Sequence, residues 1–189
     1  MNVLILNGGP RKKGTVATLL ETAAEGIPAD RETEWIDVYD LTVAPCIGCM
    51  KCRPDRTCVL PEDDGHRVGR MIREADGLVV GTPTHWGNMS APLKCLFDRN
   101  VPVFMGESPK GMPVPRQKGK PAVIATACTA PWPFNVISPE SRGAIRAVRS
   151  VLGAGGYKIV AKLVKPGTKK DPTIPEKLLS AARAAGTRF

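Results

Sequence analysis

The sequence contains no apolar run long enough to cross a membrane, because none approaches the roughly 20 residues that a spanning helix needs. Residues 1–7 also lack the basic region and the long apolar core of a secretory signal. They predict a first β-strand instead, and we expect a cytoplasmic protein. No break in composition divides the 189 residues, so we predict a single domain over residues 1–189.

Aromatic residues and histidines are scarce, at 5% of the chain and two residues respectively. The net charge of +9 would suit a nucleic-acid partner, but the basic residues are not interleaved with aromatic side chains. We therefore expect no nucleic-acid partner, and interpret the charge as a solvated surface or as an attraction for anionic ligands. No Ser-His-Asp or Cys-His nucleophile pattern is evident, so no side chain is assigned a catalytic role.

The sequence does contain an alternation of apolar strands and amphipathic helices. Strands are predicted at residues 3–6, 33–38, 77–81, 121–127 and 157–164, and helices at 15–25, 62–75, 90–99, 138–152 and 174–185. The strands show no clean polar alternation, which is typical of a parallel sheet covered on both faces. We predict an α/β three-layer sandwich with a five-stranded parallel sheet and helices on both faces. Residues 101–119, rich in Pro, Gly and Lys, are expected to form a surface loop.

Three loops should meet at the carboxyl edge of this sheet, where open α/β sheets bind their ligands. In the first loop, Gly8, Gly9 and Gly14 let the backbone approach a ligand, and the helix that follows offers N–H groups to a phosphate. Arg11 can add a bidentate contact to that phosphate. The spacing matches neither a Walker motif nor a dinucleotide fingerprint, and a purely structural turn is the alternative.

The other two loops have residues suited to a planar ring. In residues 82–88, Trp86 could stack on a ring and Asn88 could hydrogen-bond its edge, whereas the alternative is that Trp86 packs under a helix. Residues 126–133 begin with small side chains that permit close approach of a ligand. One loop suited to phosphate and two suited to a ring predict a mononucleotide, whose identity the pattern leaves open.

These loops resemble those of the NAD(P)H-dependent FMN reductase family, within the flavodoxin-like superfamily. Residues 7–15 (NGGPRKKGT) are similar to its phosphate loop, and residues 75–99 (ADGLVVGTPTHWGNMSAPLKCLFDR) are similar to its most specific segment. The resemblance runs from Val3 to about Ala127, and beyond that it rests on element order. It implies a flavodoxin-like fold that binds FMN through Gly9, Pro10, Arg11, Gly14, Thr15, Val16, Pro83, Thr84, His85, Trp86, Gly87, Asn88, Thr126, Ala127 and Cys128.

The chain departs from the family pattern at four of these positions. Gly9 stands where the family usually has serine, Thr15 replaces asparagine and Val16 replaces threonine. The phosphate would then depend more on backbone N–H groups, Arg11 and the Thr15 hydroxyl, so we expect weaker FMN binding. His85 stands where the family often has tyrosine, which leaves ring stacking more to Trp86.

Four of the six cysteines, Cys46, Cys49, Cys52 and Cys58, lie in one loop over residues 46–58. Such closely spaced thiolates can hold an iron–sulfur cluster, and zinc or free thiols are the alternatives. The run resembles the C-x2-C-x2-C-x5-C motif of iron–sulfur flavoproteins, which implies a [4Fe–4S] cluster. Cys95 is expected to be an inert buried thiol, and Cys128 to be a small packing residue.

Two features near the loop have structural interpretations. His66 is interpreted as a surface residue of its helix, and the Asp63–Asp64 pair as a charge arrangement at the start of that helix.

The resemblance implies an FMN-dependent oxidoreductase that forms homodimers or homotetramers. With a cluster, it would pass single electrons between FMN and a ferredoxin-type partner. Without a cluster, NAD(P)H would be the donor, and quinones or free flavin the acceptors. The alternative from another class is a non-enzymatic zinc- or redox-sensing module whose flavodoxin-like scaffold has lost FMN. An electron-carrier flavodoxin is a third interpretation, and the basic charge argues against it.

Overall fold

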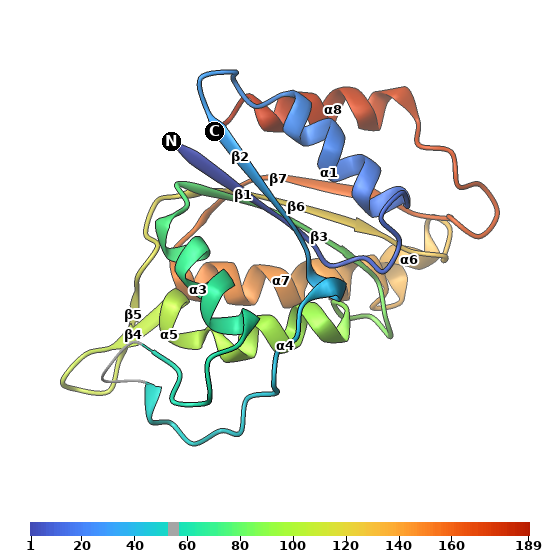
Figure 1. Cartoon of the computed structure of the whole chain (residues 1–189). Helices are drawn as coiled ribbons and strands as arrows, with labels where there is room; N and C mark the ends of the chain where they lie inside the picture. The colour runs from blue at the N-terminus through green and yellow to red at the C-terminus, as the bar shows by residue number, and fades with distance from the viewer. Residues whose placement is uncertain (53–56) are drawn as a thin grey trace.

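The computed structural model of the chain describes residues 1–52 and 57–189. It contains a five-stranded parallel sheet in the order β2-β1-β3-β6-β7 (Figure 1). The strands are β1 (Asn2–Asn7), β2 (Glu32–Asp37), β3 (Gly77–Pro83), β6 (Pro121–Ala127) and β7 (Lys158–Lys165). This is the strand order of flavodoxin-like sheets, so the predicted fold class is confirmed.

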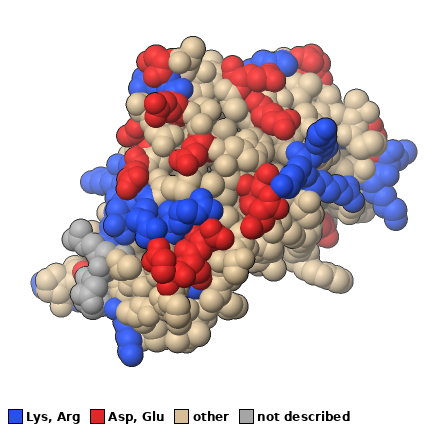
Figure 2. All heavy atoms as spheres, in the orientation of Figure 1, with Lys and Arg blue, Asp and Glu red and all other residues tan. Residues whose placement is uncertain are grey.

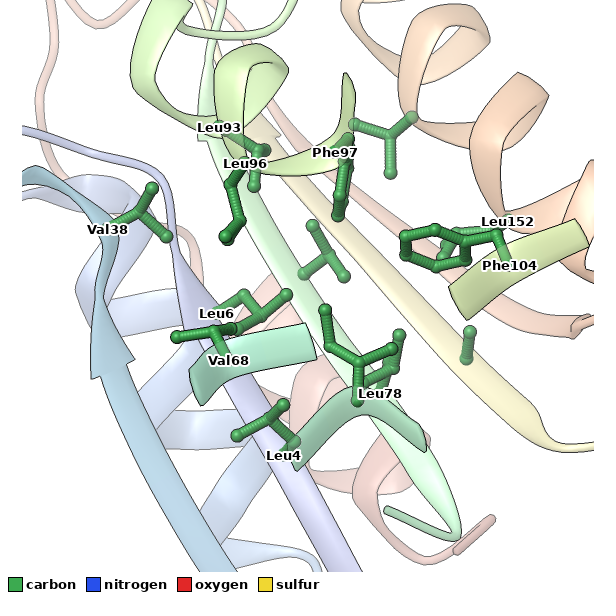
Figure 3. Packing of buried hydrophobic residues seen from close by; sticks show 14 of the residues in the cluster. Leu4, Leu6, Val38, Val68, Leu78, Leu93, Leu96, Phe97, Phe104 and Leu152 are labelled. Atoms are coloured by element: carbon green, nitrogen blue, oxygen red, sulfur yellow. The ribbon is translucent and has the colours of Figure 1, made fainter. Parts of the chain in front are cut away.

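Helices cover both faces of the sheet (Figure 1). One face carries α1 (Thr15–Glu25) and α8 (Glu176–Gly186), while the other carries α3 (Asp64–Glu74), α4 (Ala91–Arg99) and α7 (Ser141–Gly155). Successive strand residues point to opposite faces, so Leu4 and Leu6 enter one core while Val3 and Ile5 enter the other. Figure 3 shows the first of these cores, where helical leucines and phenylalanines pack on the sheet. The central strands β1, β3 and β6 are largely apolar because both of their sides are buried. The edge strands β2 and β7 carry exposed polar residues as well.

Residues 101–119 differ from the loop that the sequence predicts. They form a short helix, α5 (Val101–Phe104), and an antiparallel pair, β4 (Met105–Glu107) and β5 (Pro113–Pro115). The cause is the apolar pair Val103 and Phe104, which is buried in the core; the Phe104 ring meets the Phe97 ring edge-on at 5.4 Å. The sequence did not indicate this buried contact because the segment is rich in Pro and Gly.

The remaining short elements lie between the larger ones. A 3₁₀ turn, η1 (Val38–Asp40), follows β2, and α6 (Phe134–Ile137) precedes α7. The helix predicted at residues 138–152 thus begins three residues later, at Ser141. Within the residues that the structure describes, no helix combines the length and the apolar character that a membrane span requires.

The contact between α1 and α8 leaves no room for side chains at its closest point. A Cβ atom on Gly186 would lie 2.1 Å from the carbonyl oxygen of Ala23. We expect Gly186→Ala to lower the free energy of unfolding by about 1–3 kcal/mol because the helices must move apart. Gly153→Ala is the matched control: its Cβ would meet nothing within 4 Å, and the change should raise stability by about 0.5–1 kcal/mol. Urea unfolding of both variants measures the difference, and equal effects would contradict this packing.

Candidate functional site

A cavity of about 440 Å³ opens at the carboxyl edge of the sheet. The strand register brings the loops together, because Asn7 pairs with Gly81 and Pro83 pairs with Ala127. The cavity is lined by Gly9, Pro10, Arg11, Gly14, Thr15, Val16, Pro83, Thr84, His85, Ala127, Cys128, Thr129, Thr168, Lys169 and Pro172. Its volume lies within the range of small-molecule sites.

The β1–α1 loop forms the polar end of the cavity. The Gly8 N–H donates to the Gly81 carbonyl at 2.8 Å, and the Gly9 N–H donates to Oδ1 of Asn7 at 3.1 Å, so the loop is fixed against the sheet. A Cβ on Gly8 would lie 2.8 Å from that Gly81 oxygen, which explains the glycine. Gly14 takes the N-cap position of α1 and has no side chain to cap it, so the N–H groups of the first turn stay available to an anion.

The β7–α8 loop supplies a fourth wall that the sequence analysis missed. The Thr168 hydroxyl donates to the Cys128 carbonyl at 3.1 Å, and this anchors the loop beside the third predicted segment. Lys169 then lines the cavity with Arg11, and neither forms an ion pair with an acid of the described residues. Figure 2 shows basic side chains gathered on the side where the β1–α1 and β7–α8 loops lie. The signal was present in the sequence as Lys169-Lys170, in the loop that follows the fifth strand.

The β3–α4 loop is a tight hairpin that points Trp86 into solvent. His85 and Asn88 exchange two backbone hydrogen bonds of 2.9 Å, and Trp86 and Gly87 between them have φ values of 51° and 69°. Positive φ at both central residues is the requirement of a type I′ turn. The Trp86 side chain is fully exposed, which excludes packing under a helix.

Cys128 and its neighbours form the floor of the cavity. The Thr84 N–H donates to the Ala127 carbonyl at 2.9 Å, which joins the second and third loops. Thr126 is buried beneath them, with its hydroxyl 3.4 Å from that of Thr84. Burial raises the pKa of the Cys128 thiol, which therefore stays protonated and uncharged where it lines the cavity.

Most of the predicted ligand residues thus meet around one cavity, and four do not line it. Trp86 and Asn88 line a separate open hollow together with Met89 and Lys94. This hollow and the first cavity have only Thr84 and His85 in common. Gly87 packs against the start of α7, where a Cβ on Gly87 would lie 2.3 Å from the Pro139 carbonyl oxygen. Thr126, the fourth, supports the cavity from below.

A family model of NADPH-dependent FMN reductases matches residues 1–149. The chain belongs to this family. The match includes three of the loops around the cavity, whereas the β7–α8 loop with Lys169 lies beyond it. The resemblance drawn from residues 7–15 and 75–99 is confirmed by this match.

Relatives of this FMN reductase family member include proteins named for a second cofactor. An iron–sulfur flavoprotein of Methanocaldococcus jannaschii is 36% identical over 107 residues, which cover 56% of this chain and 55% of the relative. One of Clostridioides difficile is 26% identical across 100% of this chain and 78% of its own length. The chain spans about half the length of the first curated relatives it matches. An NAD(P)H:quinone oxidoreductase from Methanothermobacter marburgensis shares the fold, with a TM-score of 0.75 at 24% identity over 99% of this chain and 98% of that one.

The four-cysteine loop lies outside the cavity, between η1 and α3. Cys46 and Cys49 are exposed, while Cys52 and Cys58 are partly buried. Burial raises the pKa of the Cys52 thiol, and the charges of Cys58, Cys46 and Cys49 raise it further. Among the described residues, no three acidic, histidine or cysteine side chains converge on one metal position. The donor set itself, four thiols, fits a cluster.

Cys95, predicted to be an inert buried thiol, is only partly buried. Its Sγ lies 3.6 Å from the Val43 carbonyl oxygen, at one end of the cysteine loop. Burial raises the pKa of this thiol, which favours the protonated and unreactive form.

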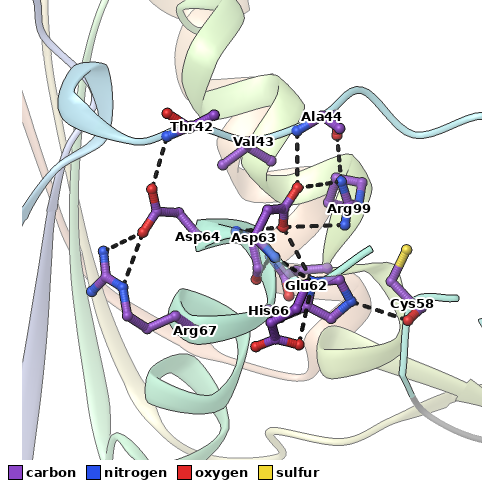
Figure 4. A network of polar contacts seen from close by, with 12 residues as sticks. Thr42, Val43, Ala44, Cys58, Glu62, Asp63, Asp64, His66, Arg67 and Arg99 are labelled. Atoms are coloured by element: carbon purple, nitrogen blue, oxygen red, sulfur yellow. Dashed lines mark hydrogen bonds and ion pairs between the residues drawn. The ribbon is translucent and has the colours of Figure 1, made fainter. Parts of the chain in front are cut away.

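A polar network joins the two ends of this loop (Figure 4). Asp63 caps α3, accepts from the Gly65 N–H at 2.9 Å and from the Ala44 N–H at 3.0 Å, and pairs with Arg99 at 2.8 Å. His66 does not lie on the surface as predicted: its side chain is 6% exposed. The reason is that Nδ1 accepts from the Asp63 N–H, completing a capping box, while Nε2 lies 3.1 Å from the Cys58 carbonyl oxygen. The predicted charge arrangement at the helix start is confirmed.

The network makes the stability of the protein depend on the ionisation of Asp63. Burial alone would raise the pKa of Asp63, but the Ala44 N–H and the Arg99 guanidinium outweigh it and hold the pKa below its usual value of 3.8. A depressed carboxylate pKa contributes stability above the unfolded value and loses it as the pH falls through the folded value. We expect the unfolding free energy of Asp63→Asn to decrease less than that of the wild type as the pH falls below about 4. Urea unfolding between pH 6 and about pH 3 measures this, and an unchanged pH slope in the variant would contradict it.

Proposed function

We propose that the protein is an FMN-dependent oxidoreductase that takes electrons from NAD(P)H, with FMN in the cavity at the carboxyl edge of the sheet. The observation that carries this proposal is one cavity lined by two kinds of group. The uncapped start of α1 lines it together with Arg11 and Lys169, neither of which has an ion pair among the described residues, and uncharged loop residues line the rest. This polarity matches a phosphate joined to a flat ring system. Family membership supports FMN as the mononucleotide.

Each wall of the cavity has a distinct part in holding the cofactor. The first-turn N–H groups of α1, with Arg11 and Lys169, neutralise the phosphate. Pro83 and His85 on one side, and Ala127 and Cys128 on the other, orient the ring and exclude water from it. Bound FMN supplies hydride and single-electron chemistry. The protonated Cys128 thiol adds no negative charge beside the ring, so it does not oppose reduction of the flavin.

We propose further that Cys46, Cys49, Cys52 and Cys58 hold a [4Fe–4S] cluster. The four closely spaced thiols and the names of the curated relatives support this. Such a cluster exchanges one electron at a time, which suits a ferredoxin-type partner. The positive net charge of +9 would favour encounter with an acidic carrier of that kind.

A homodimer or homotetramer is also part of the proposal. Large apolar side chains are exposed on the β3–α4 loop and on the segment that follows β6: Trp86, Trp132, Phe134, Val136 and Ile137. Apolar surface gathered beside a cavity is typical of a surface that another chain covers. Light scattering at micromolar concentration is expected to give at least twice the monomer mass of 20.2 kDa. A monomer under these conditions would contradict this part.

Anaerobic turnover tests the enzymatic proposal. The protein, supplied with FMN, is mixed with NADH or NADPH, and loss of the visible flavin absorbance is followed. We expect flavin reduction at a rate proportional to protein concentration. A protein that binds no FMN and reduces none would favour the non-enzymatic sensing module instead.

A further inference from the structure

One buried side chain, Arg99, holds both ends of the four-cysteine loop (Figure 4). Its Nη1 donates to the carbonyl oxygen of Ala44 at 2.6 Å, two residues before Cys46. Nη1 and Nη2 also donate to the two carboxylate oxygens of Asp63, at 2.8 and 3.2 Å, five residues after Cys58. A single planar guanidinium therefore fixes the separation of the two points where the loop leaves the folded core.

The first part of the loop, residues 44–51, depends on these ends because it has little packing of its own. Residues 44–51 are exposed, and Gly48 makes a weak hydrogen bond of 3.5 Å to the Cys46 sulfur. The ends are tied more firmly: the Asp64 N–H donates to the Thr42 carbonyl at 3.3 Å, and the Asp64 carboxylate accepts from the Thr42 N–H at 2.9 Å. Closing an exposed segment of this length costs chain entropy, which the end contacts must offset.

These contacts use three of the five N–H groups of Arg99, and Nε is among those they leave unused. Its Nε is buried and finds no hydrogen-bond acceptor in the part of the chain that the structure describes. Arg99 and Cys58 line the same hollow, of about 100 Å³. A buried N–H without an acceptor is costly, and a thiolate sulfur is the kind of acceptor that is missing.

We propose that Arg99 is the positioning residue of the cysteine loop, fixing its two ends through Ala44 and Asp63 and donating its free Nε–H toward the Cys58 thiolate. The second part rests on the proposed function, because only a loaded loop holds that thiolate. Outer contacts of this kind hold metal ligands in place, and their loss typically costs about 10- to 100-fold in metal affinity.

The permanent charge of Arg99 has a second effect, on the redox balance of the loop. A positive charge beside a cluster favours the reduced state, which carries one more electron. Loss of the charge should therefore make the midpoint potential of the cluster more negative. If Arg99 only held the loop in place, its replacement would loosen the loop without making the midpoint potential of the cluster more negative.

The test compares three changes with one control in protein purified anaerobically. Arg99→Met removes both the charge and the hydrogen-bonding guanidinium, whereas Arg99→Lys keeps the charge. Asp63→Asn removes the ion pair but keeps a residue that caps helices well. Arg67→Met is the control, because Arg67 pairs with the adjacent Asp64 on the exposed side of the same network. The readouts are iron and labile sulfide per chain, the rate of iron loss to a chelator, the cluster potential and bound FMN.

We expect Arg99→Met to lose iron at least about 10-fold faster and to have a more negative cluster potential, with bound FMN unchanged. Arg99→Lys should restore the potential but not the retention, Asp63→Asn should lose iron faster, and Arg67→Met should match the wild type. Unchanged retention and potential in Arg99→Met would overturn the inference.

An iron-free wild type would refute the cluster, and with it the donation to Cys58. Hydrogen exchange of the wild type and of Arg99→Met would then decide the anchoring role. Faster exchange over residues 42–52 and 57–64 in Arg99→Met, but not in Arg67→Met, supports anchoring, and equal exchange overturns it. Should Arg99→Met fail to fold, Arg99→Lys and Asp63→Asn carry the comparisons of iron retention and hydrogen exchange.

Discussion

Replacing Arg11 by methionine is expected to weaken FMN binding by about 10- to 100-fold. Arg11 lines the phosphate end of the cavity, where Gly14 leaves the start of α1 without a side-chain cap. A hydrogen bond to a charged group contributes about 1.5–3 kcal/mol, and each 1.4 kcal/mol is a factor of ten in the dissociation constant. Gly9 and Val16 offer the phosphate no hydroxyl, so this chain should depend on Arg11 strongly.

Lys13→Met is the matched control for this prediction. It removes the same charge two positions away, from an exposed residue that does not line the cavity. Quenching of flavin fluorescence on titration gives the dissociation constant of each variant at fixed ionic strength. A control that weakens binding as much as Arg11→Met would show that general charge attraction, and not this contact, holds the phosphate.

Replacing Cys49 by alanine is expected to remove nearly all iron from the protein while leaving FMN binding within about twofold. A [4Fe–4S] cluster needs four thiolate ligands, so the loss of one leaves an iron open to solvent and the cluster unstable. The flavin should persist because the cavity is built on the β1, β3, β6 and β7 loops, and none of the four cysteines lines it. The measurement is iron, labile sulfide and flavin per chain after anaerobic purification.

Cys95→Ala provides the comparison, since Cys95 lies on α4 outside the four-cysteine motif. It should leave iron content unchanged. Zinc in the wild type in place of iron, with loss of zinc in Cys49→Ala, would assign the loop to a structural metal and remove the single-electron partner from the proposal. Equal iron in Cys49→Ala and the wild type would contradict cysteine ligation altogether.

The sequence predicted the sheet well because burial on both faces leaves a strong local pattern. β6 (Pro121–Ala127) and α1 (Thr15–Glu25) have the predicted bounds, since each is a continuous apolar or amphipathic segment between turn residues. Three of the four loops around the cavity were also predicted, because the carboxyl ends of parallel strands meet at one edge. Lys169 could have been predicted in the same way, because it follows a strand of the same sheet, but it lies beyond the segment that resembles the family.

The sequence could not reveal contacts between distant segments. Arg99 meets Ala44 and Asp63 across 55 and 36 positions, and no local pattern marks such a meeting. His66 looked like an exposed helical residue because histidine replaces the Glu or Gln that usually marks a capping box. The direction of Trp86 was open for a similar reason, since it depends on the turn that Gly87 permits.

The cofactor content of the protein purified without oxygen tests the proposed function most directly. Its visible spectrum is recorded together with flavin, iron, labile sulfide and zinc per chain. We expect flavin absorbance with one FMN and about four irons per chain. Flavin without iron or sulfide would contradict the cluster and leave a plain FMN reductase. A protein that holds no flavin and takes up none when FMN is added would contradict the proposal that the cavity binds FMN.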